Sequence, residues 1–251
     1  MKKEGNCYKK NFIKKVIAKI DFVEPVSVFT PETIKDAVSQ IKERFPIPEQ
    51  SVASQQEITF SKKGVVHNKS DFPEWIFHGR DRNKILKVNK LFIEVLLTKY
   101  GTENDFKNDL TTPISHLLKI KPGIAIRRTG IRFINVFDFK IDNFQDAPNY
   151  FSKAITGHFS DMTNIDKCSR AFMINEFVYD DIKLKVQTGF FNPDYPATVK
   201  RNHFVIDIDA YIDTPHLIND MEAYFNRLHD VIEEHFEELI TEKLRTNILN
   251  G

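Results

Sequence analysis

Two arginines and a glycine in the middle of the chain form the pattern with the clearest chemical meaning. Arg128, Gly130 and Arg132 alternate within a run from Ala125 to Phe139 that is rich in Ile, Phe and Val. Such a run favours a β-strand, in which residues two apart face the same side. A glycine between two guanidinium groups leaves room for a carboxylate or phosphate ligand. The alternative is that both arginines form structural ion pairs with aspartates of a neighbouring strand.

A second strand pattern carries carboxylates. Residues 203–213 alternate, so that Asp207 and Asp209 share the polar face of the strand. Paired carboxylates can bind a divalent cation or act as acid and base. No third ligand stands at a suitable spacing, and lysines of the strand before offer ordinary cross-strand ion pairs, each worth roughly 0.2–1 kcal/mol. We therefore expect no metal. The candidate ligand-binding set is Arg128, Arg132, Asn135, Asp207 and Asp209.

The chain carries no recognisable enzyme signature. Its eight histidines form no metal-binding pattern, and the glycine-rich nucleotide motifs and the nucleophile elbow are missing from the sequence. His229 and Glu233 stand four apart, the spacing of a surface pair on a helix. We therefore expect no catalytic residues and no cofactor, and we favour a binding protein over an enzyme.

Composition narrows the class of protein. The 251 residues carry a formal net charge of +1, 41% hydrophobic and 28% charged residues, and 22 Phe. These values are typical of a globular domain with a phenylalanine-rich core, and they give no general attraction to nucleic acid or to anionic membrane. Cys7 and Cys168 form no disulfide or zinc pattern, no apolar run could span a bilayer, and the N-terminus resembles no signal peptide. We expect a cytoplasmic location.

Hydrophobic periodicity and residues typical of helix starts and turns predict the strands and helices that would position these residues. The predicted strands are 12–23, 55–61, 73–79, 84–89, 91–99, 125–139, 169–179, 182–191 and 203–213. The predicted helices start at Thr30-Pro31, Asn104, about Asn143 and Thr214-Pro215. The last helix should extend beyond Leu239 and bury Leu228 and Phe236.

The elements come in an order that repeats. After a flexible arm at 1–11, residues 12–120 and 121–251 each predict a β-α-β-β-β-α half, and the second ends in the long helix. We expect an α+β fold in which helices pack on one face of an antiparallel sheet. Strands 182–191 and 203–213 should form a hairpin. If Phe190 pairs with Phe204, Gln187 lies opposite Asp207 and Lys185 opposite Asp209, and the pattern fixes the parity of the pairing but not its exact register.

The signals together resemble a family of prokaryotic proteins of about this length. The family is catalogued by number, occurs sporadically and has no settled function. The strongest shared block is Arg128-Thr129-Gly130-Ile131-Arg132-Phe133-Ile134-Asn135, an RxGxRxIN pattern. Weaker likenesses cover most of the chain: Arg44-Phe45-Pro46, Trp75-Ile76-Phe77, Tyr100 with Phe106, Asp207-Ile208-Asp209, and His229 to Leu244. The resemblance implies no reaction, and its patchy occurrence suggests mobile or defence-type genes by analogy only.

Three functional classes stay open at this point. The first is a non-catalytic protein that binds another protein, as an accessory to a mobile or defence-type gene cassette, with a homodimer also open. The second is an enzyme or sensor that holds an anionic small ligand near Arg128 and Arg132. The third, disfavoured by the net charge, is an RNA- or DNA-binding module.

Overall fold

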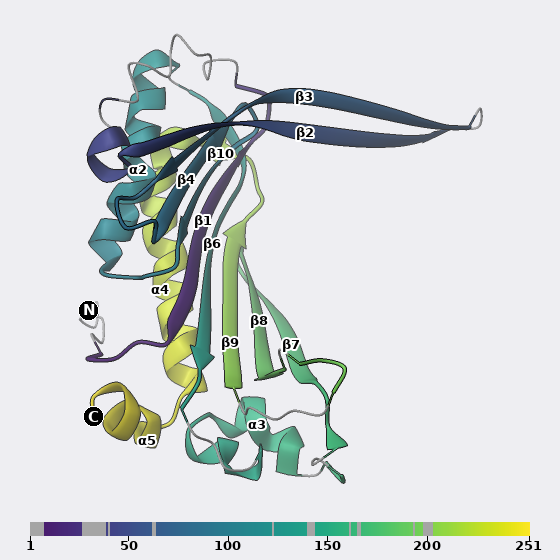
Figure 1. Cartoon of the computed structure of the whole chain (residues 1–251), viewed down its shortest axis with the longest axis vertical. Helices are drawn as coiled ribbons and strands as arrows, with labels where there is room; N and C mark the ends of the chain where they lie inside the picture. The colour runs from purple at the N-terminus through teal and green to yellow at the C-terminus, as the bar shows by residue number, and fades with distance from the viewer. Residues whose placement is uncertain are drawn as a thin grey trace. The chain divides into compact units, whose positions relative to one another are not determined.

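The fold is a mixed α+β fold built on one ten-stranded antiparallel sheet. The computed structural model describes residues 8–26, 39, 41–61, 64–121, 123–139, 144–160, 162–164, 167–192, 194–197 and 203–251. Nine strands follow the order β2-β3-β4-β5-β1-β6-β9-β8-β7, and the short β10 pairs with β6 (Figure 1). The predicted fold class, an antiparallel sheet with helices, is therefore confirmed.

The chain divides into two compact units, and neither is a continuous stretch of sequence. Unit 1 comprises Met1–Val16, Gly130–Ile212 and Phe225–Gly251, whereas unit 2 comprises Ile17–Thr129 and Asp213–Tyr224. Strands β1 (Ile13–Phe22) and β6 (Ala125–Phe137) contribute residues to both. The relationship predicted between residues 12–120 and 121–251 stays a prediction.

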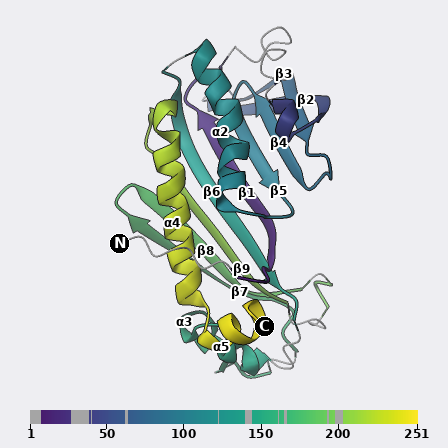
Figure 2. The ribbon, with the colours of Figure 1, turned by 90° about the vertical axis from the view of Figure 1, so that its left-hand side faces the viewer.

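Unit 2 contains the first half of the sheet and one long helix. Its strands after β1 are β2 (Ile47–Ser61), β3 (Gly64–His78), β4 (Lys84–Asn89) and β5 (Phe92–Leu97). Helix α2 (Glu103–Ile120) lies over one face of these strands (Figure 2). Its side chains Phe106, Leu110 and Ile114 are buried, as their helical spacing predicts.

Unit 1 contains the second half of the sheet and five helical segments among its described residues. Its strands after β6 are β7 (Ala171–Tyr179), β8 (Ile182–Phe191) and β9 (His203–Ile212). The 3₁₀-helix η1 (Phe144–Asn149) and helix α3 (Lys153–Ser160) precede β7. Helix α4 (Met221–Leu239) contributes its residues from Phe225 onward, and α5 (Glu242–Leu244) and the π-helix η4 (Arg245–Leu249) end the chain.

Phenylalanine rings form the core of unit 1. Phe151 stacks on Phe204 with ring centroids 4.1 Å apart, and Phe190 meets Phe204 edge-on at 5.2 Å. Phe137 and Phe159 complete the cluster, and all five side chains are buried. Offset and edge-on contacts of this kind are the favoured geometries between aromatic rings. The high phenylalanine content thus builds a specific packed layer between the sheet and the segments η1 and α3.

The register predicted for the second hairpin is correct. Strands β8 and β9 pair Phe190 with Phe204, Gln187 with Asp207 and Lys185 with Asp209. Leu184, Val186, Ile206 and Ile208 are buried, whereas Lys185 and Asp209 are partly exposed. A one-residue slip would turn every apolar side chain of the hairpin to the wrong face, which is why the pattern specified the parity.

Two helix predictions need correction. Residues 143–155 do not form one helix, because η1 ends at Asn149 and α3 begins only at Lys153. Pro148 lacks the N–H that an α-helix would use at this position. The signal Thr214-Pro215 does not start the last helix either: β10 (His216–Leu217) and the 3₁₀-turn η3 (Ile218–Asp220) follow it, and α4 begins at Met221.

The end of the last helix and the first hairpin also differ from expectation. Helix α4 stops at Leu239 and Ile240 bridges to Phe151, while Phe236 is only half-buried and Leu228 is fully buried. Strands β2 and β3 are far longer than the predicted 55–61 and 73–79, since period-two alternation is weak in their polar sequence. The helix start at Thr30-Pro31 lies outside the described residues, but residues 41–44 are helical and end before Pro46.

Candidate functional site

A small polar pocket in unit 1 contains three of the five candidate residues. It lies on the face of the sheet that carries the polar side chains of β8 and β9, and its volume is about 80 Å³. The lining side chains come from β6, β8 and β9: Arg132, Lys185, Gln187, Asp207 and Asp209. Period-two alternation on three neighbouring strands brings these groups together, since each strand presents its polar set on this face.

The best-defined contact of the pocket is the ion pair between Arg132 and Asp207. Arg132 Nε donates to Asp207 Oδ1 at 2.8 Å, and Nη2 donates to Oδ2 at 2.6 Å. This bidentate geometry is the strongest arrangement for the two groups. The hydrogen bonds to the Asp207 carboxylate raise the pKa of Arg132, and the nearby charge of Asp209 acts in the same direction. Asp207 is nearly buried, so the arginine supplies the counter-charge that its burial requires.

Lys185 and Gln187 are the polar lining residues that the sequence did not single out as a site. The register places Lys185 opposite Asp209, yet the Lys185 ammonium forms no ion pair with any residue in the described ranges. The Gln187 amide likewise has no hydrogen bond to the described part of the chain. The expected neutralisation of Asp209 by Lys185 is therefore wrong, and two donors face the pocket.

The remaining two candidates lie elsewhere. Asn135 is buried on the opposite face of β6, where its Nδ2 donates to the carbonyl of Ile206 at 3.3 Å. Residues 132 and 135 differ in parity, so they cannot share one face of a straight strand. Arg128 belongs to unit 2, is half-buried there and does not line the pocket. The central block therefore supplies one pocket residue, Arg132.

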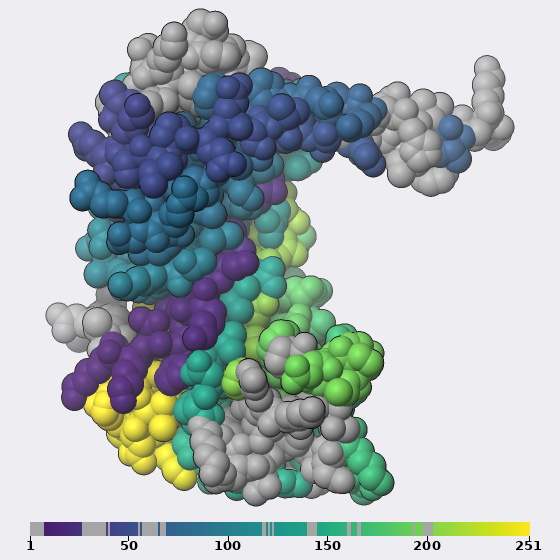
Figure 3. Space-filling view, in the orientation of Figure 1, coloured from purple at the N-terminus to yellow at the C-terminus, as the bar shows by residue number. Residues whose placement is uncertain are grey.

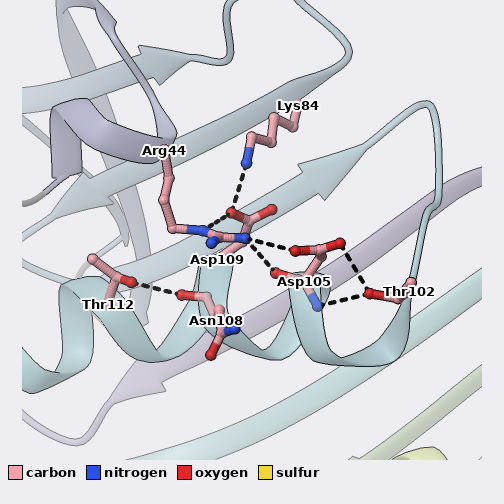
Figure 4. A network of polar contacts seen from close by, with 7 residues as sticks. All are labelled: Arg44, Lys84, Thr102, Asp105, Asn108, Asp109 and Thr112. Carbon is pink, nitrogen blue, oxygen red and sulfur yellow. Dashed lines mark hydrogen bonds and ion pairs between the residues drawn. The ribbon is translucent and has the colours of Figure 1, made fainter.

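Unit 2 holds a second cluster of charges, around the buried carboxylate of Asp109 on α2. Lys84 Nζ lies 2.7 Å from Asp109 Oδ1, and Arg44 Nε donates to the same oxygen (Figure 4). Arg44 also donates to the carbonyl oxygen of Asp105 at 2.9 Å, and Thr102 caps the start of the helix by accepting from Asp105 N–H. The cluster ties the helical turn 41–44, β4 and α2 together, which is a structural role.

A buried histidine explains how β10 is held. His216 Nδ1 lies 2.8 Å from the carbonyl of Thr214, so Nδ1 must carry the proton. Nε2 can then accept from the hydroxyl of Thr129, at 2.9 Å. Both partners belong to unit 2, and the bond fastens β10 beside the start of β6. The histidine is thus satisfied within the fold.

The polar groups that line the pocket decide which ligands it could hold. Among the described residues, no group of three or more His, Cys, Asp or Glu side chains is placed to hold a metal ion. The carboxylate of Asp207 is engaged by Arg132, and the other lining groups are the donors of Lys185 and Gln187 beside the carboxylate of Asp209. Such a site can hold an oxyanion, because ammonium, guanidinium and amide N–H groups all donate to it.

Two comparisons with known protein sequences gave no match. The chain matches no protein-family model, and no curated protein sequence matches it significantly. The resemblance of the central block to a sporadic prokaryotic family stays a prediction. None of the helices in the described ranges is long and apolar enough to cross a membrane.

Proposed function

We propose that this protein is a non-catalytic binding protein that engages another protein through the β2–β3 hairpin. The proposal rests on the observation that only a short part of this hairpin pairs with the rest of the sheet. Strand β3 pairs with β4 only from Glu74 to His78. From Gly64 to Pro73 it pairs with β2 alone, opposite Val52 to Ser61. We call this outer part, 52–61 with 64–73, the ribbon.

The ribbon is too long to be stabilised by the pairing of its two strands alone. Each strand of the hairpin has 15 residues, whereas strands usually have 3–10. A hairpin with two strands alone is at best marginally stable in water, and stability comes from a third strand or from packing against another element. The part of the ribbon nearest the sheet stands clear of the other strands of unit 2 (Figure 3). A partner that supplies the missing packing therefore fits the ribbon.

The described side chains of the ribbon favour a protein over a nucleic acid. Val52 is 68% exposed and Val65 is 52% exposed, so each strand of the hairpin offers apolar surface, and the register places both valines on one face. The charges are balanced, because Lys69 pairs with Asp71 at 3.6 Å, and Asp71 also accepts from Ser54. Nucleic-acid binding would instead require uncompensated positive charge.

Site-specific photocrosslinking tests this proposal. A photoreactive amino acid replaces Val52 or Val65 on the ribbon, and it replaces Val23, an exposed valine off the ribbon, as the matched control. In cells that naturally produce the protein, the two ribbon positions should give the same distinct protein adduct and the control position should not. Adducts with nucleic acid, or the same pattern from all three positions, would contradict the proposal.

A shortened hairpin separates function from folding. Residues 55–70 are replaced by Asn-Gly, which closes a two-residue turn next to the pair Ser54 and Asp71. The melting temperature should stay close to that of the wild type, since the removed residues pair only with each other. The protein adduct formed from position 52 should then be lost. Retention of the adduct would place the partner elsewhere.

The pocket favours a second candidate function, the binding of a small oxyanion such as phosphate or a carboxylate. The specific observation is that Lys185 and Gln187 face the pocket without partners among the described residues. Calorimetric titration with inorganic phosphate and with acetate tests it. Lys185→Ala should weaken binding by about tenfold or more, since an ion pair in a partly enclosed site contributes about 1.4 kcal/mol or more.

Lys183 provides the matched control for the pocket. It lies two residues before Lys185 on the same face of β8 but does not line the pocket. Lys183→Ala removes the same charge and should leave the affinity unchanged. Equal weakening by both substitutions would indicate general attraction of anions, and no heat of binding in the wild type would rule out the site.

A further inference from the structure

Strand β7 is an edge of the sheet that lacks the usual protection against pairing. It stands last in the strand order, so no strand among the described residues pairs with the backbone on its outer side. Its nine residues, AFMINEFVY, include one charged side chain, Glu176, and no proline. By contrast, the opposite edge strand β2 contains Pro48 and two glutamates. Charges and prolines are the common means by which edge strands avoid pairing with another chain.

Apolar side chains are exposed on both faces of β7. Ile174 is 54% exposed and Val178 is 71% exposed on the face that β7 shares with Lys183 and Gln187. On the other face Phe177 and Tyr179 are partly exposed, although both rings contact His235 of α4. An added strand would cover both sets at once, since cross-strand neighbours pack on each face of a sheet.

The sequence of β7 is complementary to itself in the antiparallel direction. Consider a two-fold axis that is perpendicular to the sheet and passes between the Asn175 residues of two copies. It pairs odd positions with odd and even with even, so each side chain stays on the same face of the joined sheet as its partner. Phe172 then lies opposite Val178 of the second copy, and Met173 lies opposite Phe177. Glu176 lies opposite Ile174, so the single charge of the strand meets no like charge directly across.

We infer that β7 is the interface of a homodimer in which the sheets of two copies join edge to edge, antiparallel about Asn175. A two-fold contact of this kind is closed, because each copy uses its only β7 edge and no further copy can add there. The nearly neutral chain, with a formal charge of +1, also brings little repulsion between two copies. The inference concerns unit 1 and is independent of the ribbon in unit 2.

Sedimentation equilibrium tests whether the dimer forms and whether it needs β7. Val178→Lys places a charge opposite Phe172 of the second copy and should raise the dimer dissociation constant by tenfold or more. Val52→Lys, at a similarly exposed valine on the ribbon, is the matched control and should leave that constant unchanged. A wild-type protein that stays monomeric, or a dimer insensitive to Val178→Lys, would overturn the inference, and in the monomeric case a peptide from another protein becomes the occupant to seek.

A cysteine crosslink tests the position of the axis. In a background where Ser replaces Cys7 and Cys168, Asn175→Cys puts two cysteines directly across the axis. Residues directly opposite in antiparallel strands have Cα atoms about 4.5–5.5 Å apart, within the range of a disulfide. The oxidised protein should run as a covalent dimer. Val178→Cys is the control, because its two copies would lie ~20 Å apart. Equal crosslinking at both positions would refute the proposed register.

Discussion

Arg132 shows how one residue can belong to a site and to the structure at once. Its Nε and Nη2 are committed to Asp207, which needs a counter-charge because it is nearly buried. The guanidinium group nevertheless stays partly exposed at the pocket beside Lys185 and Gln187. The pairing with Asp207 therefore orients Arg132, and Lys185 is the residue whose charge is available to a ligand.

The pair between Arg132 and Asp207 should show a measurable coupling energy. We expect a double-mutant cycle with Arg132→Ala and Asp207→Ala to give about 1–2 kcal/mol, because bidentate geometry strengthens the pair while partial exposure of the arginine screens it. Urea unfolding of the four proteins measures the coupling. Arg132→Lys keeps the positive charge but cannot form the bidentate hydrogen bonds of the guanidinium group. It should therefore recover only part of the stability that Arg132→Ala loses. A coupling near zero would show that the pair contributes nothing to folding.

Tyr8 predicts a dependence of stability on alkaline pH. Its hydroxyl donates to Glu237 Oε1 at 2.6 Å, and burial, followed by this hydrogen bond, raises the pKa of Tyr8 above its usual range. In the unfolded chain the phenol ionises near pH 10. The stabilisation is therefore fully present below about pH 10 and is lost as pH rises toward the higher folded-state pKa.

Comparison with Tyr8→Phe isolates this effect. At neutral pH we expect the variant to be about 1 kcal/mol less stable, since one hydrogen bond to a carboxylate is removed. Above about pH 10 the difference in unfolding free energy should shrink, because only the wild type contains the titrating phenol. Denaturant titrations from about pH 8 to about pH 11 measure it. A difference independent of pH would show that Tyr8 is not held as the structure describes.

At the scale of elements, the position at which helix α4 ends affects how deeply its apolar residues are buried. Thr241 caps the next turn by accepting from Leu244 N–H, and Ile240 bridges to Phe151, so the helix must end at Leu239. Leu228, in the middle of the helix, is fully buried. Phe236, in the last turn, is only half-buried. The stripe of apolar residues on α4 is thus buried unequally along its length.

Two truncations on α4 should therefore differ in cost. Leu228→Ala should destabilise by about 2–5 kcal/mol, as expected for a fully buried leucine. Phe236→Ala should cost less, roughly 1–2 kcal/mol, because part of the side chain is already exposed to water. Urea unfolding compares the two proteins directly. The reverse order would mean that the last turn of the helix is packed more tightly than the structure shows.

At the scale of the whole molecule, net charge argues against general binding of nucleic acid. The chain carries 36 Lys and Arg against 35 Asp and Glu. Many described cations are also paired with acids, for example Arg44 and Lys84 with Asp109, and Arg227 with Asp181. The near balance of charge therefore leaves little net positive charge to attract a phosphate backbone.

We therefore expect little or no binding to random single- or double-stranded nucleic acid at physiological salt. Fluorescence anisotropy with labelled oligonucleotides of mixed sequence measures this, and titration at low and high salt separates electrostatic from specific binding. Sub-micromolar binding that weakens steeply with salt would reverse the conclusion and make a nucleic-acid module the leading function.

The sequence by itself determined the hairpin of β8 and β9 and the parity of its pairing, because period-two alternation leaves one parity that buries the apolar face; the exact pair of Lys185 with Asp209 came from the structure. It also determined the fold class and the phenylalanine core. Local signals failed where pairing with a distant segment determines the structure. Thr214-Pro215 has the form of a helix start, but the following residues form β10, which pairs with β6, and α4 begins only at Met221.

Only the tertiary structure decided which polar groups meet. The pocket gathers residues from three strands, so no local pattern could show that Arg132 would choose Asp207 or that Lys185 would be left without an ion pair among the described residues. The same holds for the surfaces that carry the two interaction proposals. Whether a strand is an edge, as β7 is, or extends past its neighbours, as β2 and β3 do, depends on strand order, and strand order is set by non-local pairing.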